Sequence, residues 1–208
     1  MKAQKLMNNS SAGYVRILHA VPNAPNVDVY ANDKLIAENL DYGNYTDYLP
    51  LNEGTYKLSL YATGDKSSPV LTSMLSIKKD EIFTVVASGT LENIFFLKII
   101  DSDVPAQSGN AMVRFAHLSP NAPAVDITLP DGTILFENIS FKQVTSYIQA
   151  PPSNYTLQVR LTGTPTVALT VPNIQLDQNT IYTVYAIGLA GESPELQALL
   201  LEDSTVLK

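Results

Sequence analysis

The sequence predicts an all-β protein built from two tandem β-sandwich domains, immunoglobulin-like or transthyretin-like in layout. Three observations lead to this fold class: the chain repeats itself at a nearly fixed offset, apolar residues alternate with polar ones, and turn residues separate short runs. No stretch keeps a helical period for more than two turns, so helix is expected to be minor. Copies of roughly 100 residues with about seven or eight strands each suit two sandwiches better than one long barrel.

The repeat covers nearly the whole chain. The segment 16–29 returns as 114–127, with His19 recurring as His117, an offset of 98 residues. After a one-residue insertion the offset becomes 99, and the later matches are Asn39 with Asn138, Thr46 with Thr145, Tyr48 with Tyr147, Tyr56 with Tyr155, and Gly89 with Gly188. We therefore predict a flexible tail at 1–13, one sandwich at 14–104, a linker at 105–110 and a second sandwich at 111–208.

The alternating pattern predicts half-buried strands within each copy. Val15, Ile17 and His19 share one face of an expected strand, and Arg16 and Leu18 share the other. β-branched and aromatic residues dominate the later runs 82–86 and 181–185. Turn residues close the strands, as in Asn52-Glu53-Gly54, Pro130-Asp131-Gly132 and Pro151-Pro152-Ser153-Asn154.

Composition and charge exclude several classes of function. The chain has 208 residues, 45% of them hydrophobic and 16% charged, with a net charge of −7. This acidic balance disfavours a nucleic-acid partner, and no apolar run approaches the ~20 residues of a transmembrane segment. The absence of cysteine excludes thiolate metal sites and cysteine nucleophiles. No signal peptide is visible at the N-terminus, and no cofactor or metal is expected.

Two histidines, each nine residues before an aspartate, are the most suggestive polar residues. The pairs are His19 with Asp28 and His117 with Asp126. One interpretation joins imidazole and carboxylate as metal ligands or as base and orienting group in a hydrolase. The favoured interpretation is structural: a partly buried histidine donates to the aspartate or to a backbone carbonyl and fixes the loop.

Prolines and an arginine flank these pairs in both copies. Four prolines fix the backbone between the first two strands of each copy: Pro22, Pro25, Pro120 and Pro123. Arg16 and Arg114 lie on the strand face opposite the histidines and are interpreted as structural residues, which could pair with an acidic neighbour such as Glu38 or Glu137 across the sheet.

A tyrosine cluster in the first copy is the candidate ligand-binding patch. Tyr42, Tyr45 and Tyr48 lie among acidic and amide residues and could stack on sugars. The second copy has Phe141, Val144 and Tyr147 at these positions. Core or rim packing is therefore the preferred interpretation of these side chains.

The repeated pattern His-x-x-Pro-Asn-Ala-Pro-x-Val-Asp, with the later Glu-Asn and Thr-x-Tyr, resembles the bacterial domain-of-unknown-function 4397 family. The resemblance covers residues 14–208 in two copies. It implies a sandwich fold in envelope-associated or secreted bacterial proteins, and it carries no catalytic residues onto this chain. The lack of a visible signal peptide departs from many relatives and favours an intracellular or spore-associated location.

These observations lead to one functional expectation and two alternatives. We expect a non-catalytic structural or adhesive module at a bacterial cell or spore surface, whose partner is an envelope polymer or a protein. The first alternative is a carbohydrate-binding module that uses the exposed tyrosines. The second, ranked last, is a metal-dependent hydrolase that uses the histidine–aspartate pairs. We expect no catalytic residue and no enzyme activity.

Overall fold

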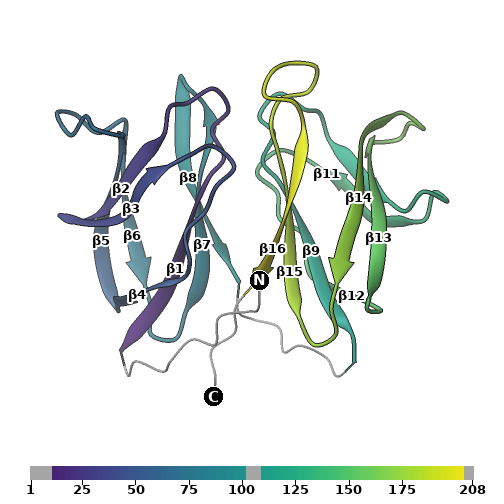
Figure 1. Cartoon of the computed structure of the whole chain (residues 1–208), viewed down its shortest axis with the longest axis horizontal. Coiled ribbons are helices and arrows are strands. Elements are labelled where there is room, and N and C mark those ends of the chain that lie inside the picture. The colour runs from purple at the N-terminus through teal and green to yellow at the C-terminus, as the bar shows by residue number, and fades with distance from the viewer. Residues whose placement is uncertain (1–10, 102–108, 204–208) are drawn as a thin grey trace. The chain divides into compact units, whose positions relative to one another are not determined.

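The computed structural model describes residues 11–101 and 109–203, and in these two ranges it contains strands, turns and loops and no helix. Two compact units divide the described chain, one on each side of the interval 102–108. Each unit is a β-sandwich, as Figure 1 shows. The expected tail residues 1–10 and linker residues 105–108 lie outside the described residues.

The N-terminal sandwich contains eight strands. Their bounds are β1 Ala12–His19, β2 Val27–Ala31, β3 Lys34–Leu40, β4 Leu49–Asn52, β5 Gly54–Ala62, β6 Leu71–Ile77, β7 Ile82–Thr90 and β8 Asn93–Ile100. Strand β1 begins at Ala12, two residues earlier than the sequence boundary placed it.

The C-terminal sandwich contains the matching eight strands. Their bounds are β9 Ala111–His117, β10 Val125–Thr128, β11 Ile134–Ile139, β12 Ile148–Ala150, β13 Ser153–Leu161, β14 Val167–Leu176, β15 Ile181–Ile187 and β16 Gln197–Asp203. The segment 195–201, which came nearest to a helical pattern, falls largely within strand β16.

Both units have the same sheet topology. In the N-terminal unit the sheets run β4-β1-β7-β8 and β3-β2-β5-β6, and in the C-terminal unit β12-β9-β15-β16 and β11-β10-β13-β14. The first strand pairs in parallel with the seventh, with Tyr14 opposite Ile82 and Met112 opposite Ile181. Four strands in each sheet differ from the immunoglobulin constant layout of four and three. Each unit is therefore a sandwich of two four-stranded sheets.

Apolar side chains from both sheets fill the space between them. In the N-terminal unit Val15, Ile17 and Val85 come from one sheet, and Val29 and Leu58 come from the other. Because directly paired residues of neighbouring strands point to the same face, this alternation builds one continuous core per unit. Phe115, Ile127 and Leu157 occupy corresponding places in the C-terminal unit.

The central strands are buried on both faces, which corrects the half-buried expectation. Every residue of β1 and of β9 is buried, including Arg16 and Arg114. Strand β1 lies inside its sheet, with β7 on one edge and β4 on the other. Beyond β4, residues 43–46 continue along the same edge, where Thr46 N–H donates to the Ile17 carbonyl at 2.9 Å. On these strands the alternation of side chains therefore distinguishes two buried faces rather than a buried face and an exposed one.

A glycine near the end of the seventh strand is required by close backbone approach. Gly89 has φ 109° and Gly188 has φ 92°. A Cβ atom on Gly89 would lie 2.1 Å from the Asn93 carbonyl oxygen, and one on Gly188 would lie 2.2 Å from the Glu195 carbonyl oxygen. Both the positive φ and the adjacent backbone oxygen exclude a side chain, so the repeat retains glycine here.

Substituting Gly89 with alanine tests this constraint. We expect Gly89→Ala to lower the free energy of unfolding by about 2–4 kcal/mol, because strain at positive φ adds to a backbone collision. Gly132→Ala is the matched control, since Gly132 also has a positive φ of 90° but its Cβ would meet no atom within 4 Å. The control should lose only about 1 kcal/mol. Equal losses in urea unfolding would show that the carbonyl contact is unimportant.

Candidate functional site

The histidine of each copy ends the first strand, and its side chain binds the loop that follows. His19 is buried at 0% exposure. Its Nε2 donates to the Pro25 carbonyl oxygen at 3.2 Å, and its Nδ1 accepts from the Val21 N–H at 3.3 Å. These partners require a proton on Nε2 and none on Nδ1, so the ring is neutral.

The second histidine repeats the bond to the loop. His117 Nε2 donates to the Pro123 carbonyl oxygen at 3.2 Å, while its Nδ1 has no hydrogen-bond partner among the described residues. An aromatic ring packs edge-on against each imidazole, Tyr42 against His19 and Phe141 against His117, with ring centroids 6.1 and 6.4 Å apart. The two copies therefore preserve the carbonyl bond and the aromatic neighbour.

The backbone of each histidine also fastens the long loop that returns to the first sheet. His19 N–H donates to the Asn44 carbonyl at 3.0 Å, and Gly43 N–H donates to the His19 carbonyl at 2.8 Å. The same two bonds recur between His117 and residues 143 and 142. Side chain and backbone of one residue thus join the loops at 20–26 and 41–48.

Burial sets the protonation of both histidines. Desolvation lowers the pKa of His19 from its ordinary value of 6.5, and the Pro25 carbonyl and the charge of Asp41 offset this only in part. Desolvation also lowers the pKa of His117. A proton on Nδ1 of His19 would also point at the Val21 N–H, which is itself a donor. Burial and this opposing donor therefore both favour the neutral ring.

The aspartates bind a different part of each copy from the histidines. Asp28 Oδ1, on β2, accepts from the Asn39 N–H at 2.8 Å and from the Thr63 hydroxyl at 3.0 Å. Asn39 has φ 48°, a conformation that asparagine adopts more readily than most residues. The bond therefore fixes a left-handed residue in strand β3 and the turn that follows β5.

The second aspartate makes the same contacts and one more. Asp126 Oδ1 accepts from the Asn138 N–H at 2.8 Å and from the Thr162 hydroxyl at 3.0 Å, and Oδ2 accepts from the Gly163 N–H at 3.2 Å. Burial acts to raise the pKa of Asp126, but these three hydrogen bonds outweigh it and hold the pKa below its ordinary value. The carboxylate is thus occupied as a structural acceptor.

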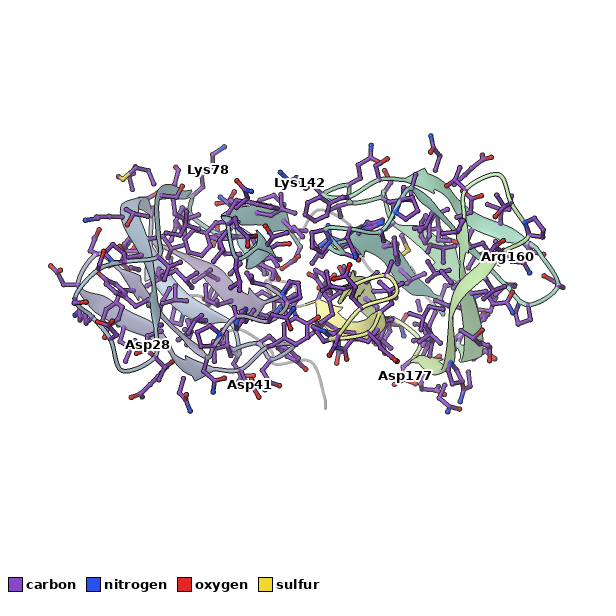
Figure 2. The ribbon with its side chains drawn as sticks, turned by 90° about the horizontal axis from the view of Figure 1, so that it is seen from above. Asp28, Asp41, Lys78, Lys142, Arg160 and Asp177 are labelled. Atoms are coloured by element: carbon purple, nitrogen blue, oxygen red, sulfur yellow. The ribbon has the colours of Figure 1, made fainter. Side chains whose placement is uncertain are left out.

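Histidine and aspartate do not form one site. Asp41 is the carboxylate whose charge acts on His19, and Figure 2 shows it apart from Asp28. Within residues 11–101 and 109–203, no group of three or more His, Cys, Asp or Glu side chains could hold a metal ion. His19 instead binds the Pro25 carbonyl, and Asp28 binds the Asn39 N–H. We call these two separate hydrogen-bonded arrangements the loop clasps.

The prolines shape the loop that the histidine holds. Pro25 and Pro123 supply the accepting carbonyls. In the first copy Pro22 precedes Asn23, which has φ 63°, and Ala24 N–H reaches the Val21 carbonyl at 3.4 Å, as in a type II turn. Pro120 occupies the equivalent position in the second copy, where the Asn121 side chain instead accepts from the Ala190 N–H at 2.8 Å.

A buried arginine cluster is the largest polar feature that the sequence analysis missed. Arg16, 2% exposed, donates from Nε to Thr84 Oγ1 at 2.9 Å, and the Thr84 hydroxyl donates to Asp101 Oδ2 at 2.6 Å. The Tyr48 hydroxyl donates to the same oxygen at 2.8 Å. Arg16 Nη2 lies 3.8 Å from Asp101 Oδ2, and its guanidinium lies 4.6 Å from the centre of the Tyr48 ring.

The second copy rebuilds this cluster atom for atom. Arg114 Nε donates to Thr183, Thr183 donates to Asp203 Oδ2 at 2.5 Å, and the Tyr147 hydroxyl donates to the same oxygen at 2.8 Å. The expected pairing of the arginines with Glu38 and Glu137 is therefore wrong. Both glutamates are exposed on strands of the other sheet, whereas the arginines lie on β1 and β9.

The three candidate tyrosines have different roles. Tyr48 is 8% exposed and belongs to the arginine cluster, so it is unsuitable as a ligand-binding residue. Tyr42 is half-buried beside His19. Tyr45 remains exposed at 41%, with the Arg16 guanidinium 5.9 Å from its ring centre. The expected patch is thus reduced to one accessible ring.

Removing the carboxylate of the arginine cluster should destabilise the fold. We expect Asp101→Asn to lower the free energy of unfolding by about 3 kcal/mol, because Arg16 would remain buried without its counter-ion. Asp131→Asn is the matched control, since Asp131 is exposed in a turn and should change stability by under about 1 kcal/mol. Chemical denaturation measures both, and an equal effect would contradict the assigned role.

The lowered histidine pKa values make stability depend on pH. Below the ordinary pKa of 6.5 the unfolded chain binds protons that the folded protein does not, so this contribution is complete above pH 6.5 and is lost as pH falls through the folded-state pKa. The free energy of unfolding, measured by urea denaturation, should therefore fall between pH 7 and pH 5. The double variant His19→Gln, His117→Gln should show a shallower fall over the same interval. Parallel curves for the two proteins would refute this linkage.

Comparisons with known proteins bear on the family rather than on the activity. No curated protein sequence is significantly similar to this chain. Among solved structures, the family 26 carbohydrate-binding module of Amy13K from Eubacterium rectale, in complex with maltoheptaose, is 11% identical. It covers 93% of this chain and 97% of its own, with a TM-score of 0.28. A candidate adhesin from Bacteroides ovatus is 10% identical over 90% of this chain and 95% of its own, with a TM-score of 0.22.

The family model matches almost all of the sequence. It covers residues 13–128 and 129–207, and the first match runs beyond β8 into the C-terminal sandwich as far as the end of β10. The motif residues that carry the clasps and the arginine cluster fall within these matches. The chain therefore belongs to the DUF4397 family, a family of domains of unknown function.

Proposed function

We propose that this protein is a non-catalytic structural or adhesive module that acts at a bacterial cell or spore surface. One observation carries the proposal: the polar side chains shared by the two copies in the described ranges hold the fold together. The histidines bind a loop carbonyl, the aspartates bind a neighbouring strand and turn, and the arginines bind a buried carboxylate. The polar chemistry preserved through the duplication is thus architectural.

The surfaces available to a partner are the strand edges and turns. Strand β6 is an edge strand, and Met74 on it is 66% exposed while Val70 just before it is 54% exposed. In the C-terminal unit, Val167 begins the corresponding edge strand β14 and is 40% exposed. Two similar weak sites on one chain gain avidity for a repetitive polymer, which supports an adhesive role. No helix in the described part of the chain is long and apolar enough to cross a membrane.

Co-sedimentation with insoluble envelope material tests this proposal. The purified protein is mixed with peptidoglycan, spore coats or cellulose at physiological and high salt, and the pelleted fraction is measured. We expect retention on one bacterial polymer and not on cellulose. The variant Met74→Ser with Val167→Ser should reduce retention, whereas Leu91→Ser, which removes an exposed apolar side chain in the turn between β7 and β8, should leave it unchanged. Complete recovery in the supernatant from every bacterial material would reject a polymer partner.

Carbohydrate binding is the second candidate, and Tyr45 is the observation that favours it. Its ring, 41% exposed, offers a stacking face to a sugar. In the same pelleting experiment, a Tyr45→Ala variant should lose glycan retention while Leu91→Ala, which removes another exposed apolar side chain, should not. Retention that survives Tyr45→Ala would leave the strand edges as the binding surface.

A further inference from the structure

The C-terminal sandwich contains an apolar cavity of about 180 Å³ between its two sheets. Residues of both sheets line it: Phe115 on β9, Ile127 on β10, Phe136 on β11, Ile148 on β12 and Leu157 on β13. It lies on the side of the edge strands β11 and β12, where Leu135, Phe136 and Ile148 are only half-buried. The position at the sandwich edge gives solvent a route to the cavity.

The lining excludes a polar occupant. Apart from Gln149 and Tyr155, the lining side chains are aliphatic, phenyl or prolyl. The Tyr155 hydroxyl already donates to the Pro151 carbonyl at 2.8 Å. Gln149 alternates with the inward-facing Ile148 and Ala150 on β12, so its side chain points away from the core. A polar group that entered would lose its water contacts without new partners.

Comparison of the two copies identifies a residue that leaves this space open. Ala150 lines the cavity and pairs with Ala111 of β9. The equivalent residue of the N-terminal copy is Leu51, which pairs with Gly13 of β1 and is buried in the core of that unit. Three side-chain carbons present at Leu51 are therefore missing at Ala150.

We propose that the C-terminal sandwich binds a small apolar group, about the size of one aromatic ring, in this cavity. An engineered cavity of about 150 Å³ lined by Leu, Ile and Phe binds benzene, and the present cavity is similar in size and chemistry. The inference goes beyond the structural or adhesive function, which requires only outer surfaces. It assigns the C-terminal copy a binding capacity located at a position where the two copies differ.

Benzene is the probe for this site, used with the full chain. We expect the thermal unfolding midpoint of the C-terminal sandwich to rise by roughly 6–11 °C when benzene is tenfold above its dissociation constant. Methyl resonances of Ile174 and Leu157, which line the cavity, should shift on titration, while those of Leu58 and Leu75 in the N-terminal core should not. Absence of both effects, or equal shifts in both cores, would overturn the proposal.

A cavity-filling variant with a matched control completes the test. Ala150→Leu introduces the side chain that the N-terminal copy has at this position, and it should abolish the benzene response. Ala168→Leu makes the same change at an exposed alanine of the same sandwich and should retain the response. If Ala150→Leu fails to fold, Ala150→Val fills less of the space and should weaken binding. An undiminished benzene response in the folded Ala150 variant would place the ligand elsewhere and refute the assignment.

Discussion

The buried pairing of an arginine with an aspartate is the interaction on which the first sheet of each copy depends. Arg16 lies on β1, Thr84 on β7, Tyr48 just before β4, and Asp101 just after β8, so one cluster reaches all four strands of the sheet. A buried ion pair adds little net stability compared with apolar packing, yet it is costly to leave half made. The cluster therefore favours the one strand order in which all four groups meet.

The clasps made by histidine and aspartate act at the connections between the sheets. The chain passes from one sheet to the other between β1 and β2 and returns between β3 and β4. His19 fastens both of these connections, and Asp28 fastens β3 to the turn after β5. Because each clasp satisfies buried or turn backbone groups with a short side chain, the loops need no further secondary structure to hold their path.

The fold and the repeat could be predicted from sequence, but the polar partners could not. Alternation and turn residues are local signals, and they gave the correct class and strand content. The arginine cluster depends on Asp101 and Asp203, which are 102 residues apart while their partners Thr84 and Thr183 are 99 apart. Because the β15–β16 connection is longer than the β7–β8 connection, an ungapped comparison does not align Asp101 with Asp203. The recurrence of Thr84 and Tyr48 in the second copy was the signal that could have indicated the cluster. The cavity depends on volume at Ala150, which periodicity does not measure.

The parallel pairing of the first and seventh strands has a consequence for synthesis of the chain. Strand β1 leaves the ribosome about 70 residues before its partner β7, so this central strand lacks one of its two neighbours until most of its copy has been made. Each sandwich is thus completed as a unit near its own C-terminal end. Because the N-terminal copy includes β7 before β15 is made, vectorial synthesis offers β1 its own partner first and limits exchange of strands between two similar copies.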